Sequence, residues 1–140
     1  MTATTSATAL IWPGEQKYIS LTTFRRTGAA VATPMWFVRL EESLYVYSDA
    51  SAGKVKRMRN DSRVQLASCT LRGNVTGPTI AGVAYIVTDA QEQARAAAAL
   101  DAKYWLERRL LRLLDRVVHL FRHSKPAPIL YLAIRPAPPR

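Results

Sequence analysis

The stretch Tyr47-Ser-Asp-Ala-Ser-Ala-Gly-Lys-Val-Lys-Arg-Met-Arg59 shows where this chain changes from strand to helix. A β-like run ends at Ser48, and small residues then lead into a short basic helix predicted over residues 53–60. Three of its cations, Lys54, Lys56 and Arg57, lie close together near its start. Because the N–H groups of a first helical turn point at an anion and cationic side chains close around it, the stretch predicts a phosphate receptor. The phosphate could belong to a cofactor, a nucleic acid or a membrane.

Short β-like segments make up much of the remaining chain. Alternating apolar residues predict a strand over residues 18–24, and Arg25-Arg-Thr-Gly28 predicts a hairpin turn with positive φ at Gly28. The other predicted strands cover residues 30–38, 44–48, 63–71, 79–88 and 129–134. Mostly sequential, antiparallel pairing of these segments predicts a mainly β fold, a small barrel or sandwich with helices at its edge.

A helical region separates the last two strands. The alanine-rich residues 89–102 predict a helix with Asp89 as its N-cap, and leucines at helical spacing continue it over 104–123. The arginines lie opposite the leucines, at Arg108, Arg109, Arg112, Arg116 and Arg122. We expect the leucine face to pack on the barrel; contact with anionic lipid and contact with nucleic acid are the alternatives.

Composition sets the general class. The 140 residues, 49% of them hydrophobic, predict one domain over 17–135, with a flexible segment at 1–16 and a tail at 136–140. The net charge of +10 favours an anionic partner. Cys69 is the only cysteine, so we expect it to pack as a small apolar residue in a cytoplasmic protein. No apolar run is long enough to predict stable membrane insertion.

Signatures of side-chain catalysis are missing from the sequence. His119 and His123 are four residues apart, but no Cys-x-x-Cys or His-Glu-x-x-His pattern accompanies them, so we expect no metal site. There is no Gly-x-Ser-x-Gly elbow, Walker loop or dinucleotide fingerprint, and no catalytic residue is assigned. If the chain is an enzyme, a bound cofactor carries the chemistry.

An irregular strand at Thr33-Pro-Met-Trp-Phe37 is the second candidate for ligand contact. Pro34 cannot donate to a strand ladder, so this strand lies at an edge, contains a bulge or contacts a ligand. Trp36 supplies a large flat surface for a ligand, with an ordinary core position as the alternative interpretation.

These motifs together resemble one protein family. The segments are Leu21-Thr-Thr-Phe-Arg-Arg, Ala32-Thr-Pro-Met-Trp-Phe, Gly53-Lys-Val-Lys-Arg, Arg59-Asn-Asp-Ser-Arg-Val64 and Thr76-Gly-Pro78. In order and spacing they resemble the split β-barrel flavin and deazaflavin oxidoreductases related to pyridoxamine 5′-phosphate oxidase, and among these the F420-dependent branch of actinobacteria. The resemblance implies a six-stranded antiparallel split β-barrel, similar to FMN-binding proteins, that forms a homodimer with the cofactor in a groove between subunits.

The resemblance also implies roles for individual residues. Lys54 and Arg57, with Lys56 nearby, would hold the cofactor phosphate. Thr33, Pro34 and Trp36 would run beside the ring system, and Ser48 would lie near the linker. The family branch usually has Ser or Thr where this chain has Ala52, so a hydroxyl ligand is missing, with Ser51 as a substitute.

The implied cofactor is F420, with FMN as the alternative. F420 carries a phosphodiester and an oligoglutamate tail, which suits the excess of Lys and Arg. The implied activity is hydride transfer from reduced F420 to an electron-poor double bond of a small molecule. The alternatives are an FMN-dependent oxidoreductase and a non-catalytic protein that binds a flavin, deazaflavin or haem; a nucleic-acid partner is not expected.

Overall fold

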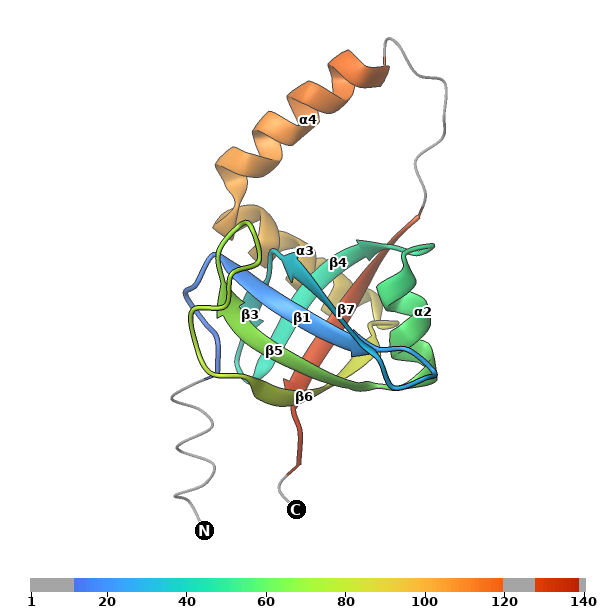
Figure 1. The fold of residues 1–140 in the computed structure, drawn as a ribbon. Coiled ribbons are helices and arrows are strands. Elements are labelled where there is room, and N and C mark those ends of the chain that lie inside the picture. Colours follow the sequence, from blue (N-terminus) through green and yellow to red (C-terminus); the bar gives the residue numbers. More distant parts are fainter. Residues whose placement is uncertain (1–11, 120–127, 139–140) are drawn as a thin grey trace.

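One antiparallel sheet organises the protein (Figure 1). The computed structural model describes residues 12–119 and 128–138. Seven strands pair in the order β2-β1-β5-β6-β7-β4-β3. They are β1 (Tyr18–Phe24), β2 (Ala30–Met35), β3 (Val38–Leu40), β4 (Ser43–Asp49), β5 (Arg63–Cys69), β6 (Ile80–Ile86) and β7 (Ile129–Pro136). The described helices are α2 (Gly53–Asn60), α3 (Ala90–Lys103) and α4 (Trp105–His119), and none of them is long and apolar enough to cross a bilayer.

The prediction of six strands was wrong because the predicted strand 30–38 is two strands. β2 pairs with β1, whereas β3 pairs with β4 at the opposite end of the strand order. Between β2 and β3, the backbone of Phe37 contacts the hydroxyl of Tyr104. The Phe37 N–H donates to that hydroxyl at 3.1 Å, and the hydroxyl lies 2.9 Å from the Phe37 carbonyl oxygen. Tyr104 therefore replaces a strand neighbour while the chain crosses from one sheet edge to the other.

The interior of the curved sheet is the main core, and α2 is part of it. The predicted helix bounds 53–60 are confirmed, and its apolar side buries Val55 and Met58. Cys69 is buried as predicted, and burial raises the pKa of its thiol. Trp12, within the predicted N-terminal segment 1–16, is also buried in this core. Packing thus fixes α2 firmly against the sheet.

The helical region is divided at Tyr104. The predicted N-cap is confirmed, since an Asp89 carboxylate oxygen accepts from the Glu92 N–H at 2.8 Å. α3 packs on the sheet through the buried residues Ala96 and Leu100. Tyr104 is non-helical and buried, and α4 starts directly after it in a new direction, away from the sheet (Figure 1). Residues 120–123 of the predicted helix lie outside the described residues.

Candidate functional site

Within the described residues, the N-terminal end of α2 has free backbone donors and no acidic residue in its first turn. Its N-cap is Ala52, which makes no side-chain cap, and no acidic residue occupies the first turn. Within the described part of the chain, no hydrogen-bond acceptor faces the backbone N–H groups of Gly53 and Lys54. Free N–H groups and the helix dipole together favour an anion at such an end.

Arg57 adds a guanidinium to the same end. Its side chain turns back along the helix, and its Nε donates to the Thr23 hydroxyl of β1 at 2.7 Å. A Cβ atom built on Gly53 would lie 2.8 Å from Arg57 Nη1, so the absence of a side chain at Gly53 makes room for the guanidinium. A cation beside a helix N-terminus is unfavourable by itself, which means that a bound anion would stabilise this arrangement.

Lys54 is the second cation at this end. Partial burial, and then the charge of Arg57, lower the pKa of Lys54 below its ordinary value. The nearby carboxylate of Asp49 opposes that shift, and it accepts hydrogen bonds from the N–H and the hydroxyl of Ser51 at 2.8 and 2.7 Å. The Ser51 hydroxyl is therefore already used, and the donors left for an anion are backbone N–H groups and two cationic side chains.

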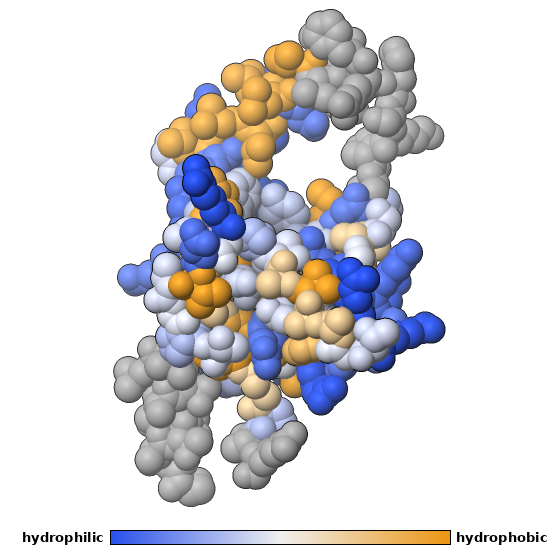
Figure 2. Space-filling view, viewed as in Figure 1, coloured by the Kyte–Doolittle hydropathy of each residue, from blue (hydrophilic) through white to orange (hydrophobic). Residues whose placement is uncertain are grey.

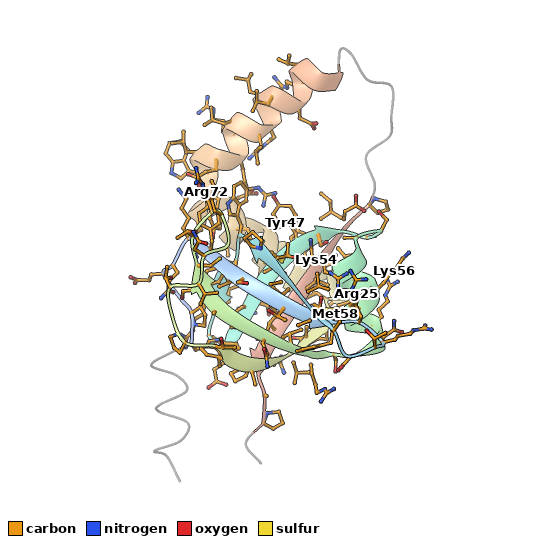
Figure 3. The ribbon with its side chains drawn as sticks, viewed as in Figure 1. Arg25, Tyr47, Lys54, Lys56, Met58 and Arg72 are labelled. Carbon is orange, nitrogen blue, oxygen red and sulfur yellow. The ribbon has the colours of Figure 1, made fainter. Side chains whose placement is uncertain are left out.

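Lys56 does not join these two cations. It is exposed, and Figure 3 shows it on the outer side of α2, whereas Lys54 lies on the side of the sheet. On a helix, residues three apart share a face, as Lys54 and Arg57 do, and a residue two apart from Lys54 does not. The structure thus brings together two of the three predicted phosphate ligands.

An aromatic groove lies on the outer face of the sheet near the base of α4. The residues that line it come from distant parts of the chain: Tyr18, Pro34, Met35, Trp36, Tyr47, Leu71 and Leu111. Pro34 and Trp36, predicted to run beside a ring system, are both among them. Trp36 also stacks on Tyr104 at 4.8 Å between ring centroids, so its ring both lines the groove and packs inside the chain. The groove offers flat apolar surfaces to a planar ligand.

The side chains of Thr33 and Ser48 lie on the faces of their strands that point away from the groove. Thr33 pairs directly with the core residue Leu21, and paired residues share a face. Ser48 is 5% exposed, and its hydroxyl donates to the Asp49 carbonyl oxygen at 3.1 Å. Tyr47, its neighbour in β4, faces the groove instead. Strand alternation is the signal that would have found Tyr47 in the sequence, once the outer face of β4 was known.

Arg108 connects α4 to the groove. Its guanidinium carbon lies 5.0 Å from the centroid of the Tyr47 ring, and its Nε donates to Asp101 at 2.8 Å. This contact between a cation and an aromatic ring holds the first turn of α4 over one end of the groove. Leu111, one turn further along, completes that end.

The described residues offer neither a cluster that could hold a metal ion nor a reactive thiol. Residues 12–119 and 128–138 contain no group of three or more His, Cys, Asp or Glu side chains that could hold a metal ion. His123 of the spaced histidine pair lies outside these ranges. The buried thiol of Cys69, with its raised pKa, is a poor nucleophile.

The chain also matches a known protein family. The sequence matches the pyridoxamine 5′-phosphate oxidase family over residues 8–125. The chain belongs to that family. The pyridoxamine 5′-phosphate oxidase family includes oxidoreductases that use flavin-type cofactors, and the seven-stranded curved sheet is consistent with its split barrel. A search of curated proteins found no match.

Solved structures with the same fold carry several functions. An F420 reductase superposes with a TM-score of 0.56 at 16% identity, covering 92% of each chain. The haem storage protein HutZ from Vibrio cholerae gives 0.61 at 14% identity, covering 89% of this chain and 84% of its own. An FAD-binding protein from Mesorhizobium loti gives 0.57 at 13% identity, covering 99% and 90%. At these identities the likeness establishes the fold alone.

Proposed function

We propose that this chain is an F420-dependent oxidoreductase that reduces an electron-poor double bond of a small molecule. The observation that carries the proposal is the N-terminal end of α2, where Lys54, Arg57 and two unpaired N–H groups converge. Membership of the pyridoxamine 5′-phosphate oxidase family supports a flavin-type cofactor. The F420 reductase among the structural neighbours shares the fold.

The two parts of the site suit the two parts of such a cofactor. The α2 end would hold the phosphodiester through charge-assisted hydrogen bonds, and the groove would take the ring system between Pro34, Trp36 and Tyr47. The net charge of +10 would attract the oligoglutamate tail and raise the association rate. FMN, with one terminal phosphate, has less need of this excess charge.

Little acid–base chemistry is required of the side chains. When bound, F420 supplies the hydride, and the protein's part is to fix the reacting groups side by side and exclude water. Trp36 is suited to that positioning role because stacking on Tyr104 holds its ring in place. The lack of a reactive thiol and of any metal cluster in the described residues fits this division of roles.

A homodimer is part of the proposal. The groove is an open one on the surface of the sheet, and a second copy laid against that face would enclose a cofactor on both sides. Sedimentation of the purified protein is expected to give a dimer, and an enclosed cofactor should strengthen the dimer through linkage. A strict monomer that still binds F420 would contradict this part alone.

Two alternative functions share the same site. FMN would place its single phosphate at Lys54 and Arg57, where two cations suffice for one phosphate. A non-catalytic carrier is the other alternative, favoured by the haem storage protein among the neighbours. Such a carrier would bind its cofactor without turnover of any pair of reductant and acceptor.

Fluorescence titration separates these functions. F420 and FMN are titrated separately into the purified protein, and we expect F420 to bind at micromolar concentration and FMN more weakly. The double variant Lys54→Ala/Arg57→Ala should lose at least about a hundredfold in F420 affinity, because each hydrogen bond to a charged group contributes about 1.5–3 kcal/mol. Arg59→Gln, an exposed charge at the other end of α2, is the matched control and should change affinity little.

The outcomes are distinct. Absence of F420 binding at micromolar concentration would overturn the leading proposal, and tight FMN binding in its place would favour the first alternative. Tight F420 binding without reduction of enones or quinones would favour the carrier. Equal loss of affinity in Arg59→Gln and in the double variant would show that general charge, rather than the α2 end, holds the phosphate.

A further inference from the structure

The apolar side of α4 is uncovered. The exposed large side chains of this helix include Trp105, Leu106, Leu110, Leu113, Leu114 and Val117, each between 49% and 61% accessible. Figure 2 shows the resulting hydrophobic strip along the projecting helix. The prediction that the leucine face packs on the barrel is thus wrong for the single chain. A soluble domain rarely exposes so continuous an apolar surface without a partner for it.

Arginines border this strip on one side. Arg109, Arg112 and Arg116 line the same shallow hollow as Trp105, Leu106, Leu110 and Leu113, all from one helix. Neither acidic residue of α4 lines that hollow; one of them, Glu107, pairs with Lys17 at 3.4 Å. In the described part of the protein, Arg109 and Arg116 form no ion pair, and Arg112 reaches Asp101 only at 3.9 Å. Leucines and a tryptophan beside these arginines form a surface that is both apolar and cationic.

Charge distinguishes the two partners considered for this surface, a second copy of the chain and an anionic lipid bilayer. A second copy docked on this face around a two-fold axis would add its own three arginines to the contact, because an isologous contact uses the same patch on both subunits. No carboxylate of the described residues lines the hollow to offset them. An anionic bilayer supplies both partners at once, acyl chains for the leucines and phosphates for the guanidinium groups.

We propose that α4 docks on the surface of an anionic lipid bilayer. The helix lies in the plane of the interface with its leucine face toward the acyl chains, Trp105 at the headgroup level, and Arg109, Arg112 and Arg116 at the lipid phosphates. At 15 residues α4 lies on the bilayer and does not span it. This site is separate from the α2 end and holds whether or not the chain uses F420.

Flotation with lipid vesicles tests the proposal on the whole chain. The wild-type protein should float with vesicles of phosphatidylcholine containing about one third phosphatidylglycerol, remain behind with pure phosphatidylcholine, and bind more weakly as salt is raised. Leu110→Glu/Leu114→Glu should lose at least about a hundredfold in affinity, since it places two carboxylates against the acyl layer. Arg109→Gln/Arg116→Gln should lose about thirtyfold at low salt.

A charge-matched control separates local contact from net charge. Arg26→Gln/Arg95→Gln removes the same two charges at exposed positions outside α4 and should stay within about threefold of wild type. Trp105 also gives a direct signal: its emission should shift to the blue on adding anionic vesicles, and Trp105→Phe should lose most of that shift while still floating. All these positions are exposed, so circular dichroism should show an unchanged fold.

Three results would overturn the proposal. The first is failure of the wild-type protein to float with anionic vesicles. The second is unchanged flotation of Leu110→Glu/Leu114→Glu. The third is a wild-type dimer that ignores vesicles and dissociates in that leucine variant, which would assign the strip to a second copy.

Discussion

α2 and α4 are both basic amphipathic helices, yet they relate to the sheet in opposite ways. α2 buries Val55 and Met58, at 0% and 4% exposure, and one of its cations is hydrogen-bonded to a strand. α4 projects away from the sheet (Figure 1) and leaves its leucines about half exposed. The apolar side of α2 is covered within the chain, whereas most of the apolar side of α4 is left uncovered by the described residues.

Two helices with a similar pattern of charge present their cations differently because they pack differently. At α2, burial fixes the helix, so Lys54 and Arg57 are held at one small site that suits one phosphate. At α4, Arg109, Arg112 and Arg116 are spread along a strip that suits an extended anionic surface. The small site at α2 and the broad surface of α4 therefore lead to separate predictions.

The largest expected contrast is in stability. Met58→Ala should lower the free energy of unfolding by about 2–5 kcal/mol, because it leaves a cavity in the core. Leu113→Ala on α4 should change it by no more than about 0.5 kcal/mol. Urea denaturation measures both. A large cost for Leu113→Ala that grows with protein concentration would mean that a second copy covers α4.

A smaller contrast is expected when arginine is replaced by lysine. Arg57→Lys keeps the charge but removes the planar fork and the bond to Thr23, so F420 affinity should fall about tenfold. The matched change Arg116→Lys on α4 should leave F420 affinity within about twofold, since Arg116 lies outside the proposed cofactor site. Similar losses in both variants would remove the distinction between the two helices.

Gly53→Ala probes the fit of Arg57 against its own helix. The new methyl group would meet Arg57 Nη1 at 2.8 Å and push the guanidinium away from the first turn. Affinity for F420 should fall about threefold to tenfold, while stability stays within about 0.5 kcal/mol because Gly53 is exposed. Unchanged affinity in titration would show that the position of the guanidinium is unimportant.

The smallest effect concerns pH. Burial and Arg57 lower the pKa of Lys54, so Lys54 loses its proton at a lower pH than an ordinary lysine. A phosphate binds the protonated form, and F420 affinity should therefore decline as the pH rises through the alkaline range below 10.5, the ordinary lysine value. Lys54→Arg should remove this decline, because arginine stays charged there. A titration series across that range measures it, and an identical decline in Lys54→Arg would assign the titration elsewhere.

Much of the fold could be predicted from local sequence signals. The bounds of β1 and α2 are as predicted, and the predicted strands 44–48, 63–71, 79–88 and 129–134 agree with the observed ones to within two residues at each end. These elements follow from alternation, helical spacing and turn residues, which act over short distances. The separation of β2 from β3 was missed because it depends on Tyr104, which is 67 residues from Phe37.

The site was predicted in part for the same reason. Lys54 and Arg57 could be found because one short helix carries both. The choice of Ser48 over Tyr47 was made without knowing which face of β4 is buried, and that depends on packing by the rest of the sheet. The exposure of the α4 leucines also depends on where Tyr104 redirects the chain, which no local pattern reveals.

The most direct test of the central claim is the phosphorus NMR spectrum of F420 bound to the protein. With the phosphodiester held at the N-terminal end of α2, the bound signal should shift from its free position, and Lys54→Ala/Arg57→Ala should return it there at saturating protein. A bound cofactor, seen by its fluorescence, whose phosphorus signal stays at the free position in the wild-type protein would contradict the account.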